Sequence, residues 1–302
     1  IEFKDEDYYC LKYKKDNEDD KHDNKFQFPY RRFQLFNRFA RSVCKIQAIP
    51  RKELFEAWAI ALYVHECFLK KQITTNSRSI KRFADLACSH GLLSWALLLL
   101  SSEEEEEEEI DIKNDGNKSS PITAVCIDKR MPKSSETAAR IFFEDYPQFC
   151  NDGSKSLGVK NSSALPDTQE DHESNPCWDY VEGPIESIVP DHSTLLVGIH
   201  ACGRLSDSIL DLAIQSKAPL ALVPCCHSKK FLTPGQADEF ETLVASASYS
   251  SDKNSNNNNT APTIPSYSLA DFTDAFRKKR LVEAGYTVQE VTIPEEFTPK
   301  NR

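Results

Sequence analysis

The clearest pattern in the chain is a short apolar strand, a turn of small residues and then a long apolar helix. Residues 82–91 read Arg-Phe-Ala-Asp-Leu-Ala-Cys-Ser-His-Gly, and residues 92–100 read Leu-Leu-Ser-Trp-Ala-Leu-Leu-Leu-Leu. The second segment is apolar nearly all round, which predicts a buried helix rather than an amphipathic one. Strand, small-residue turn and buried helix together are typical of the first βαβ unit of a nucleotide-binding fold.

Further apolar runs predict more strands, with helices between them. The predicted strands cover residues 122–127, 180–181, 193–199, 219–223 and 286–293, and the predicted helices cover about 131–146, 208–216 and 271–285. Alternating strands and helices indicate an α/β class. We therefore expect a Rossmann-like fold, with a parallel sheet flanked by helices, over residues 78–302.

Residues 25–77 precede this domain and predict a helical extension. Phenylalanines at helical spacing lie within residues 33–43, and residues 49–68 carry a broad apolar stripe in which His65 is expected to be a packed side chain. Residues 25–52 contain eight basic residues and no acidic one. This segment is either a phosphate-binding face or an amphipathic helix that packs its phenylalanines on the domain, and the two readings are compatible.

Polar segments interrupt the pattern at residues 101–120, 151–175 and 246–265, and residues 1–24 form a charged tail that we expect to be disordered. The first insertion contains seven consecutive glutamates, residues 103–109, which supply most of the net charge of −10. Adjacent like charges repel, so this insertion is predicted to be a solvated loop. Because the chain begins with Ile1 rather than methionine, we also expect it to be a fragment.

Composition bounds the compartment. The ten cysteines lie mostly in apolar contexts, which favours reduced thiols in an intracellular protein, cytoplasmic or nuclear, over a disulfide framework. No apolar run reaches the length of a membrane span, and no basic-then-apolar signal segment opens the chain. We therefore expect no membrane association.

Candidate chemistry lies where the predicted strands end. Asp85 is near the end of the first strand, and Asp128 ends the second, where such folds bind a ribose diol. The fourth and fifth predicted strands, residues 193–199 and 219–223, run into His200-Ala-Cys-Gly-x-x-x-Asp207 and Cys225-Cys-His227. The carboxyl ends of adjacent parallel strands line one crevice, so these motifs should meet there, with Ser206 or Asp207 capping the following helix.

Histidine and cysteine are zinc ligands, so these strand ends are a candidate metal site. Adjacent Cys225 and Cys226 would point to opposite sides of an extended chain. The sequence therefore predicts no metal.

The segment Asp85-Leu-Ala-Cys-Ser-His-Gly91 resembles the D-x-G-x-G-x-G loop of class I S-adenosylmethionine-dependent methyltransferases, with Ala87 and Ser89 in place of two glycines. The His200 and Cys225 motifs are similar to those of a methyltransferase-domain family that includes the tRNA acceptor-stem 2′-O-ribose methyltransferases. This resemblance covers about residues 78–302. It implies S-adenosyl-L-methionine as cofactor and a last antiparallel strand, which we expect to be missing at residue 302.

The resemblance also implies roles for individual residues. The methionine end of the cofactor would meet the loop of Asp85, Ala87, Ser89 and Gly91, its ribose Asp128, and its adenine the turn of Glu182 and Ile185, where Pro184 replaces the acid common in the family. His200 and His227 would accept a proton and Cys202 would line the methyl-transfer centre. RNA, in particular a tRNA ribose 2′-oxygen, is the candidate acceptor, bound through residues 25–52, although no zinc-finger segment of the tRNA enzymes is visible.

Two alternatives stay open. A catalytically degenerate methyltransferase fold that binds RNA or protein would explain the missing glycines, whereas the retained Asp85, Gly91 and Asp128 oppose it. A nicotinamide-dependent oxidoreductase would carry G-x-G-x-x-G, which residues 87–91 fit less well.

Overall fold

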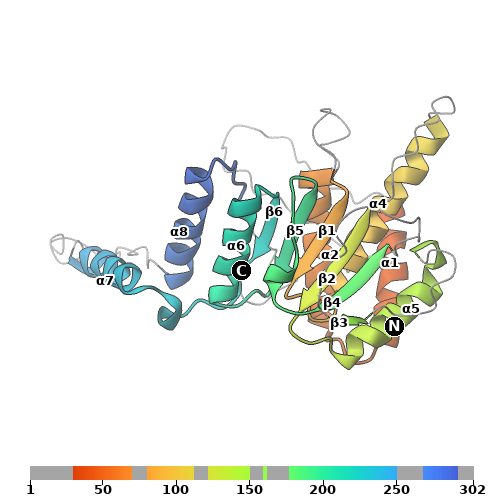
Figure 1. Ribbon diagram of the computed structural model, residues 1–302, viewed down its shortest axis with the longest axis horizontal. Helices are drawn as coiled ribbons and strands as arrows, with labels where there is room; N and C mark the ends of the chain where they lie inside the picture. The colour runs from red at the N-terminus through yellow and green to blue at the C-terminus, as the bar shows by residue number, and fades with distance from the viewer. Residues whose placement is uncertain are drawn as a thin grey trace, which may run out of the picture.

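A parallel sheet forms the centre of the molecule (Figure 1). The computed structural model describes residues 30–69, 80–111, 122–149, 159–161, 177–249 and 268–291. Within them the strands are β1 (Arg82–Leu86), β2 (Thr123–Asp128), β3 (Val159–Asn161), β4 (Trp178–Glu182), β5 (Thr194–Ile199) and β6 (Leu220–Val223). Their order is β3-β4-β2-β1-β5-β6, and every neighbouring pair is parallel. The predicted Rossmann-like α/β fold is confirmed.

Helices cover both faces of this sheet. The helices of the described residues are α1 (Tyr30–Lys45), α2 (Arg51–Val64), α4 (Leu92–Asp111), α5 (Lys133–Asp145), α6 (Arg204–Ser216), α7 (Pro234–Tyr249) and α8 (Leu269–Glu283). Short helical turns are η2 (His65–Leu69, a π-helix), η3 (Pro147–Phe149), η4 (Ile185–Ser187) and η5 (Lys229–Phe231). Figure 1 shows α1, α2, α4 and α5 gathered on one side of the strands, while α6, α8 and α7 follow one another beyond β6.

The two faces arise because successive side chains of a strand point in opposite directions. Phe83 of β1 belongs to the larger core, which α1, α2, α4 and α5 complete. Ala84 and Leu86 of the same strand point to the other face and belong to a second core, which Ile209 of α6 helps to complete. The buried runs of the sequence are thus divided between two layers of helices.

Aromatic side chains hold the N-terminal helices to the sheet. Trp95 of α4 stacks on Phe142 of α5 and on Trp178 of β4, with ring centroids 4.8 and 5.0 Å apart. Phe39 of α1 stacks on the same Phe142 at 5.6 Å, and Phe36 is also buried. The predicted packing of the phenylalanines on the domain is confirmed, and so is the burial of His65.

The glutamate run corrects one prediction. Residues 103–109 lie in α4, which continues to Asp111, rather than in a loop. Glutamate is a good helix former, so a glutamate run can continue a helix, and α4 extends away from the sheet in Figure 1. Residues 112–121 lie outside the described part of the chain.

Other elements also differ from the predictions. Residues 286–291 form no strand; instead the Tyr286 hydroxyl donates to the carbonyls of Ala213 and Ala218, at 2.6 and 3.0 Å, which ties the chain after α8 to the end of α6. Strand β3 lies inside the predicted insertion at 151–175, and α7, which reaches residue 249, was not predicted. The rest of the three insertions and the tail at 1–24 lie outside the described residues.

Among the described residues, no helix combines the length and the apolar character needed to cross a bilayer.

Candidate active site

The carboxyl ends of the central strands meet at one edge of the sheet. Leu86 of β1 is in register with Ile127, Asp128 of β2 with Glu182, and Ile199 of β5 with Val223 of β6. Ligands of open parallel sheets bind outside this edge. The predicted motifs therefore surround one region, as their positions after the strands required.

The turn between β1 and α4 keeps a glycine-like backbone although it has lost two glycines. The φ angles are +59° at Ala87, +49° at Ser89 and +71° at Gly91, all in the left-handed region that side chains disfavour. The Ala87 N–H donates to the Ile127 carbonyl at 2.8 Å, which anchors the turn to β2. At Gly91 a Cβ would lie 3.0 Å from Cys126 Sγ, so this position has no room for a side chain.

Asp128 connects this turn to the end of β2. Its Oδ2 accepts the Ser89 N–H at 3.0 Å, and its Oδ1 accepts the Lys129 N–H at 2.7 Å. Each carboxylate oxygen has a second lone pair. Asp128 is therefore held in a fixed orientation and retains acceptor capacity on both oxygens, as a carboxylate that binds a vicinal diol needs.

Asp85 is the buried acid of the site, with 2% of its surface exposed. Burial raises its pKa from 3.8 to about 7, while a 2.9 Å hydrogen bond from the Ser94 hydroxyl lowers it and the Asp128 charge raises it slightly. A carboxyl held near neutrality in this way ionises more readily when a cation approaches. The position suits the positively charged end of a ligand.

The turn predicted to bind adenine is engaged in internal contacts. Glu182 Oε1 accepts the Met131 N–H at 2.6 Å, which joins β4 to the loop after β2. Ile185 is buried in the core on the α6 face. The adenine contact of these two residues stays a prediction.

His200 follows β5 and pairs with an acid that sequence reasoning missed. Its side chain is 39% exposed, and its Nε2 lies 3.3 Å from Oε2 of Glu56, a residue of α2 whose side chain is only 4% exposed. Glu56 Oε1 lies 3.2 Å from Lys52 Nζ, whereas Oε2 accepts no hydrogen bond of good geometry from the described residues. The signal that could have revealed Glu56 is an acid within an otherwise apolar helical stripe.

The same helix reaches the β1–α4 turn. Oε2 of Glu53, one turn before Glu56, lies 3.7 Å from Nε2 of His90, and His90 Nδ1 lies 2.8 Å from the Ser134 hydroxyl of α5. Helix α2 therefore contacts both the β1–α4 turn and the segment after β5. It lies along the edge at which the strands end.

Three thiols converge after β5 and β6. The Sγ atoms of Cys202, Cys225 and Cys226 all lie within 4.8 Å of one another, with 3.2 Å between Cys202 and Cys226 and 3.6 Å between Cys225 and Cys226. Residues 224–228 are not a strand, so the alternation expected of adjacent cysteines does not apply, and that argument against a metal was wrong. Burial, together with the two neighbouring thiols, raises the pKa of Cys225 above its usual range.

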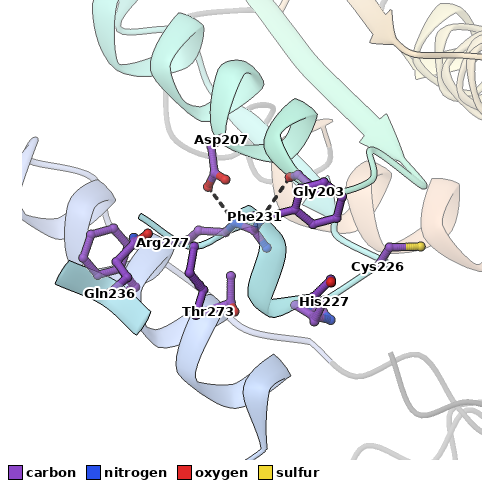
Figure 2. Close-up of a pocket in the computed structure, with 11 residues that line it drawn as sticks. Gly203, Asp207, Cys226, His227, Phe231, Gln236, Thr273 and Arg277 are labelled. Atoms are coloured by element: carbon purple, nitrogen blue, oxygen red, sulfur yellow. Dashed lines mark hydrogen bonds and ion pairs between the residues drawn. The ribbon is translucent and has the colours of Figure 1, made fainter. Parts of the chain in front are cut away.

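His227 points away from this group toward α8 (Figure 2). Its Nε2 lies 3.2 Å from Asp274 Oδ1, and the same oxygen lies 3.1 Å from Arg277 Nη1. Arg277, which is 6% exposed, also donates from Nε to Asp207 at 3.0 Å. The motif of residues 200–207 and the motif of residues 225–227 are thus joined through α8. In the sequence, Arg277 is only one residue of the basic run 277–280, so this connection was not predicted.

Asp207 corrects the predicted helix cap. Helix α6 begins at Arg204, with Gly203 at the capping position, so Ser206 and Asp207 lie inside its first turn. The Ser206 hydroxyl donates to the Ala201 carbonyl, and the Asp207 carboxylate accepts a hydrogen bond from Arg277. Asp207 therefore fastens α8 to α6 rather than ending the helix.

Comparison with known proteins gives one result. A family model described as a methyltransferase domain matches residues 63–230, which is more than half of the chain. The chain belongs to this methyltransferase-domain family. The match to the methyltransferase domain includes β1, β2, β5, β6 and both His/Cys motifs, whereas α1, α7 and α8 lie outside it. Comparisons with curated proteins and with solved structures find no match.

Proposed function

We propose that the protein is an S-adenosylmethionine-dependent methyltransferase. The observation that carries this proposal is the β1–α4 turn, which adopts left-handed φ at Ala87, Ser89 and Gly91 and binds Asp128 through a backbone N–H. The backbone thus keeps the open shape that glycines usually provide, at the place where a nucleoside would lie. Bound S-adenosylmethionine supplies an electrophilic methyl group on a sulfonium.

The residues of the edge fit such a cofactor. Asp128 offers acceptor capacity to a ribose diol, and the buried carboxyl of Asp85 would be stabilised in its charged form by a cationic ligand group. Ala87, Ser89 and Gly91 would line the methionine end, and the turn of Glu182 and Ile185 would meet the adenine.

His200 is the proposed proton acceptor of the methyl-transfer centre. It is accessible at the edge, and the buried carboxylate of Glu56 beside its Nε2 would stabilise the imidazolium that forms when a proton is taken up. His227 has its Nε2 beside Asp274, so its role is to hold the loop after β6 against α8. Cys202 would line the acceptor side of the centre.

RNA, with a tRNA ribose hydroxyl as the first candidate, is the proposed acceptor. A hydroxyl must lose a proton on methylation, which suits the His200–Glu56 pair. Several cations of residues 25–52 are used internally, since Arg32 pairs with Glu66 and Lys45 with Asp145, both at 2.5 Å. Salt-dependent methyl transfer to tRNA, lost in His200→Ala, is the expected result; transfer to no RNA would exclude this acceptor.

The test of the cofactor is calorimetric titration with S-adenosylhomocysteine. The wild type should bind with micromolar affinity, and Asp128→Ala should bind at least about tenfold more weakly, because hydrogen bonds to a charged group contribute about 1.5–3 kcal/mol each. Asp238→Ala is the matched control, since Asp238 is exposed on α7. Absence of binding in the wild type would favour the alternative, a degenerate methyltransferase fold that acts as a binding platform.

A further inference from the structure

The methyltransferase proposal uses only one of the three thiols after β5 and β6, Cys202, and uses it only to line the centre. We propose that Cys202, Cys225 and Cys226 bind one zinc ion through their thiolates and leave its fourth position open. Zinc prefers thiolate sulfur, and each of these residues offers one such atom.

The distances between the sulfurs suit a single ion. Three sulfurs about 2.3 Å from a tetrahedral zinc lie about 3.8 Å from one another. The observed separations are 3.2 Å for Cys202–Cys226 and 3.6 Å for Cys225–Cys226, and all three sulfurs lie within 4.8 Å. Increases of about 0.6 and 0.2 Å would bring the first two pairs to the spacing of zinc ligands, and the third separation exceeds that spacing by at most about 1.0 Å.

The backbone around the thiols is fixed by contacts that do not involve the sulfurs. The His200 N–H donates to the Val223 carbonyl at 3.2 Å, which joins the segments after β5 and β6. Gly203 packs under the Phe231 ring, where a Cβ would come within 2.7 Å of ring carbons. Cys202 directly precedes the capping residue of α6, and the N-terminal end of a helix stabilises a thiolate.

Among the described residues, no fourth histidine, cysteine or carboxylate joins this group. The nearby histidines are directed elsewhere, His200 toward Glu56 and His227 toward Asp274. Cys202 and Cys226 are exposed, and Figure 2 shows the Cys226 sulfur pointing away from Arg277. Three protein ligands and one position open to water or substrate are the pattern of catalytic rather than structural zinc.

The experiment measures metal on the full chain without an affinity tag, purified under reducing conditions. Elemental analysis should find one zinc per chain. Addition of zinc to the metal-free protein should release protons from the thiols. Replacement of zinc by cobalt should give the sulfur-to-cobalt charge-transfer bands and strong visible bands of a tetrahedral thiolate site. Loss of a residue that only hydrogen-bonds to a metal ligand usually weakens metal binding by roughly 10–100-fold. Cys226→Ser removes a ligand itself, so it should weaken zinc binding by more than this. Cys202→Ser should do the same.

Cys44→Ser is the matched control, because Cys44 is an exposed thiol of α1. Circular dichroism shows whether each variant is folded, and Cys226 is exposed, so its replacement should leave the fold intact. The proposal is overturned if the folded wild type binds no zinc, or if Cys226→Ser and Cys44→Ser bind zinc equally. A Cys202–Cys226 disulfide in place of the metal would also overturn it. None of these outcomes depends on S-adenosylhomocysteine binding.

Discussion

Individual residues of the edge are held in conformations that their side chains disfavour, and the neighbouring contacts explain why. Ala87 and Ser89 adopt positive φ because the turn is fastened at both ends, by the Ile127 carbonyl and by the Asp128 carboxylate. The left-handed region costs a non-glycine residue about 1–3 kcal/mol. Such a cost at two positions of one turn is typical of a functional site.

Gly203 gives a prediction at the same scale. Its φ of +61° and the 2.7 Å approach of the Phe231 ring leave no room for a methyl group. Gly203→Ala should therefore lower the free energy of unfolding by at least about 1–3 kcal/mol, measured by urea denaturation. Gly235→Ala is the matched control, because no atom lies within 4 Å of its added Cβ and its φ is not positive. Equal stability of the two variants would contradict the packing described here.

At the scale of elements, α2 is more than a cover for the sheet. Its apolar stripe was predictable from spacing, but its buried Glu56 contacts a residue far along the chain, His200. We expect His200→Ala to lower turnover with tRNA by about 10²–10⁴-fold, the usual contribution of a general base. Glu56→Gln should lower kcat by about tenfold with little change in KM, and the two effects should not add, because the residues are in contact.

Glu144→Gln is the control for this prediction, since Glu144 is exposed and its carboxylate pairs with Arg140 of the same helix at 3.1 Å. The wild type, His200→Ala, Glu56→Gln and Glu144→Gln should all bind S-adenosylhomocysteine with the same affinity, because neither His200 nor Glu56 is assigned to the cofactor. Full additivity of His200→Ala and Glu56→Gln would remove the positioning role from Glu56.

The same scale shows how far the sequence could predict the structure. Strands β1, β2, β5 and β6 are found within about two residues of the predicted ranges, because buried parallel strands are continuous apolar runs. Residues 286–291 show a different strand pattern, in which apolar and polar residues alternate, but they pair with no strand in the described part of the chain. A strand needs a partner edge, which periodicity alone does not supply.

The site was predictable to a similar degree. Its motifs follow the ends of strands, so the sequence placed Asp85, Asp128, His200 and the cysteines at this edge of the sheet, while their roles in binding and catalysis stay predictions. Glu56 and Arg277 were missed because each acts through a contact between distant segments, and neither belongs to a local motif. The convergence of the thiols depends on the irregular backbone of residues 224–228, which no periodic pattern describes.

For the whole molecule, the edge of the sheet depends on elements beyond the matched methyltransferase domain. Arg277 of α8 joins Asp207 and Asp274, and Asp274 in turn lies beside His227. Helix α8 lies outside residues 63–230, yet it holds both motifs of the β5 and β6 ends. The segment that carries the family's pattern thus relies on a later helix for its geometry.

Stability as a function of pH tests this edge in the intact molecule through Asp85. Its pKa is raised by burial from 3.8 in the unfolded chain to about 7 in the folded protein. Below pH 3.8 the carboxyl is protonated in both states, so its titration does not change the free energy of unfolding. As pH rises toward 7, the unfolded chain loses this proton while the folded protein keeps it, so the free energy of unfolding falls.

Asp85→Asn removes that titration and keeps an oxygen that accepts from Ser94. The variant should therefore gain stability over the wild type as pH rises from about 4 to 7, by an amount on the order of 4 kcal/mol for a shift of about three units. Urea denaturation across this range measures the difference, with Asp238→Asn, an exposed acid, as control. Parallel curves for wild type and Asp85→Asn would show that Asp85 is ionised in the folded protein, and the proposed attraction for a cationic ligand group would then act on a charge already present.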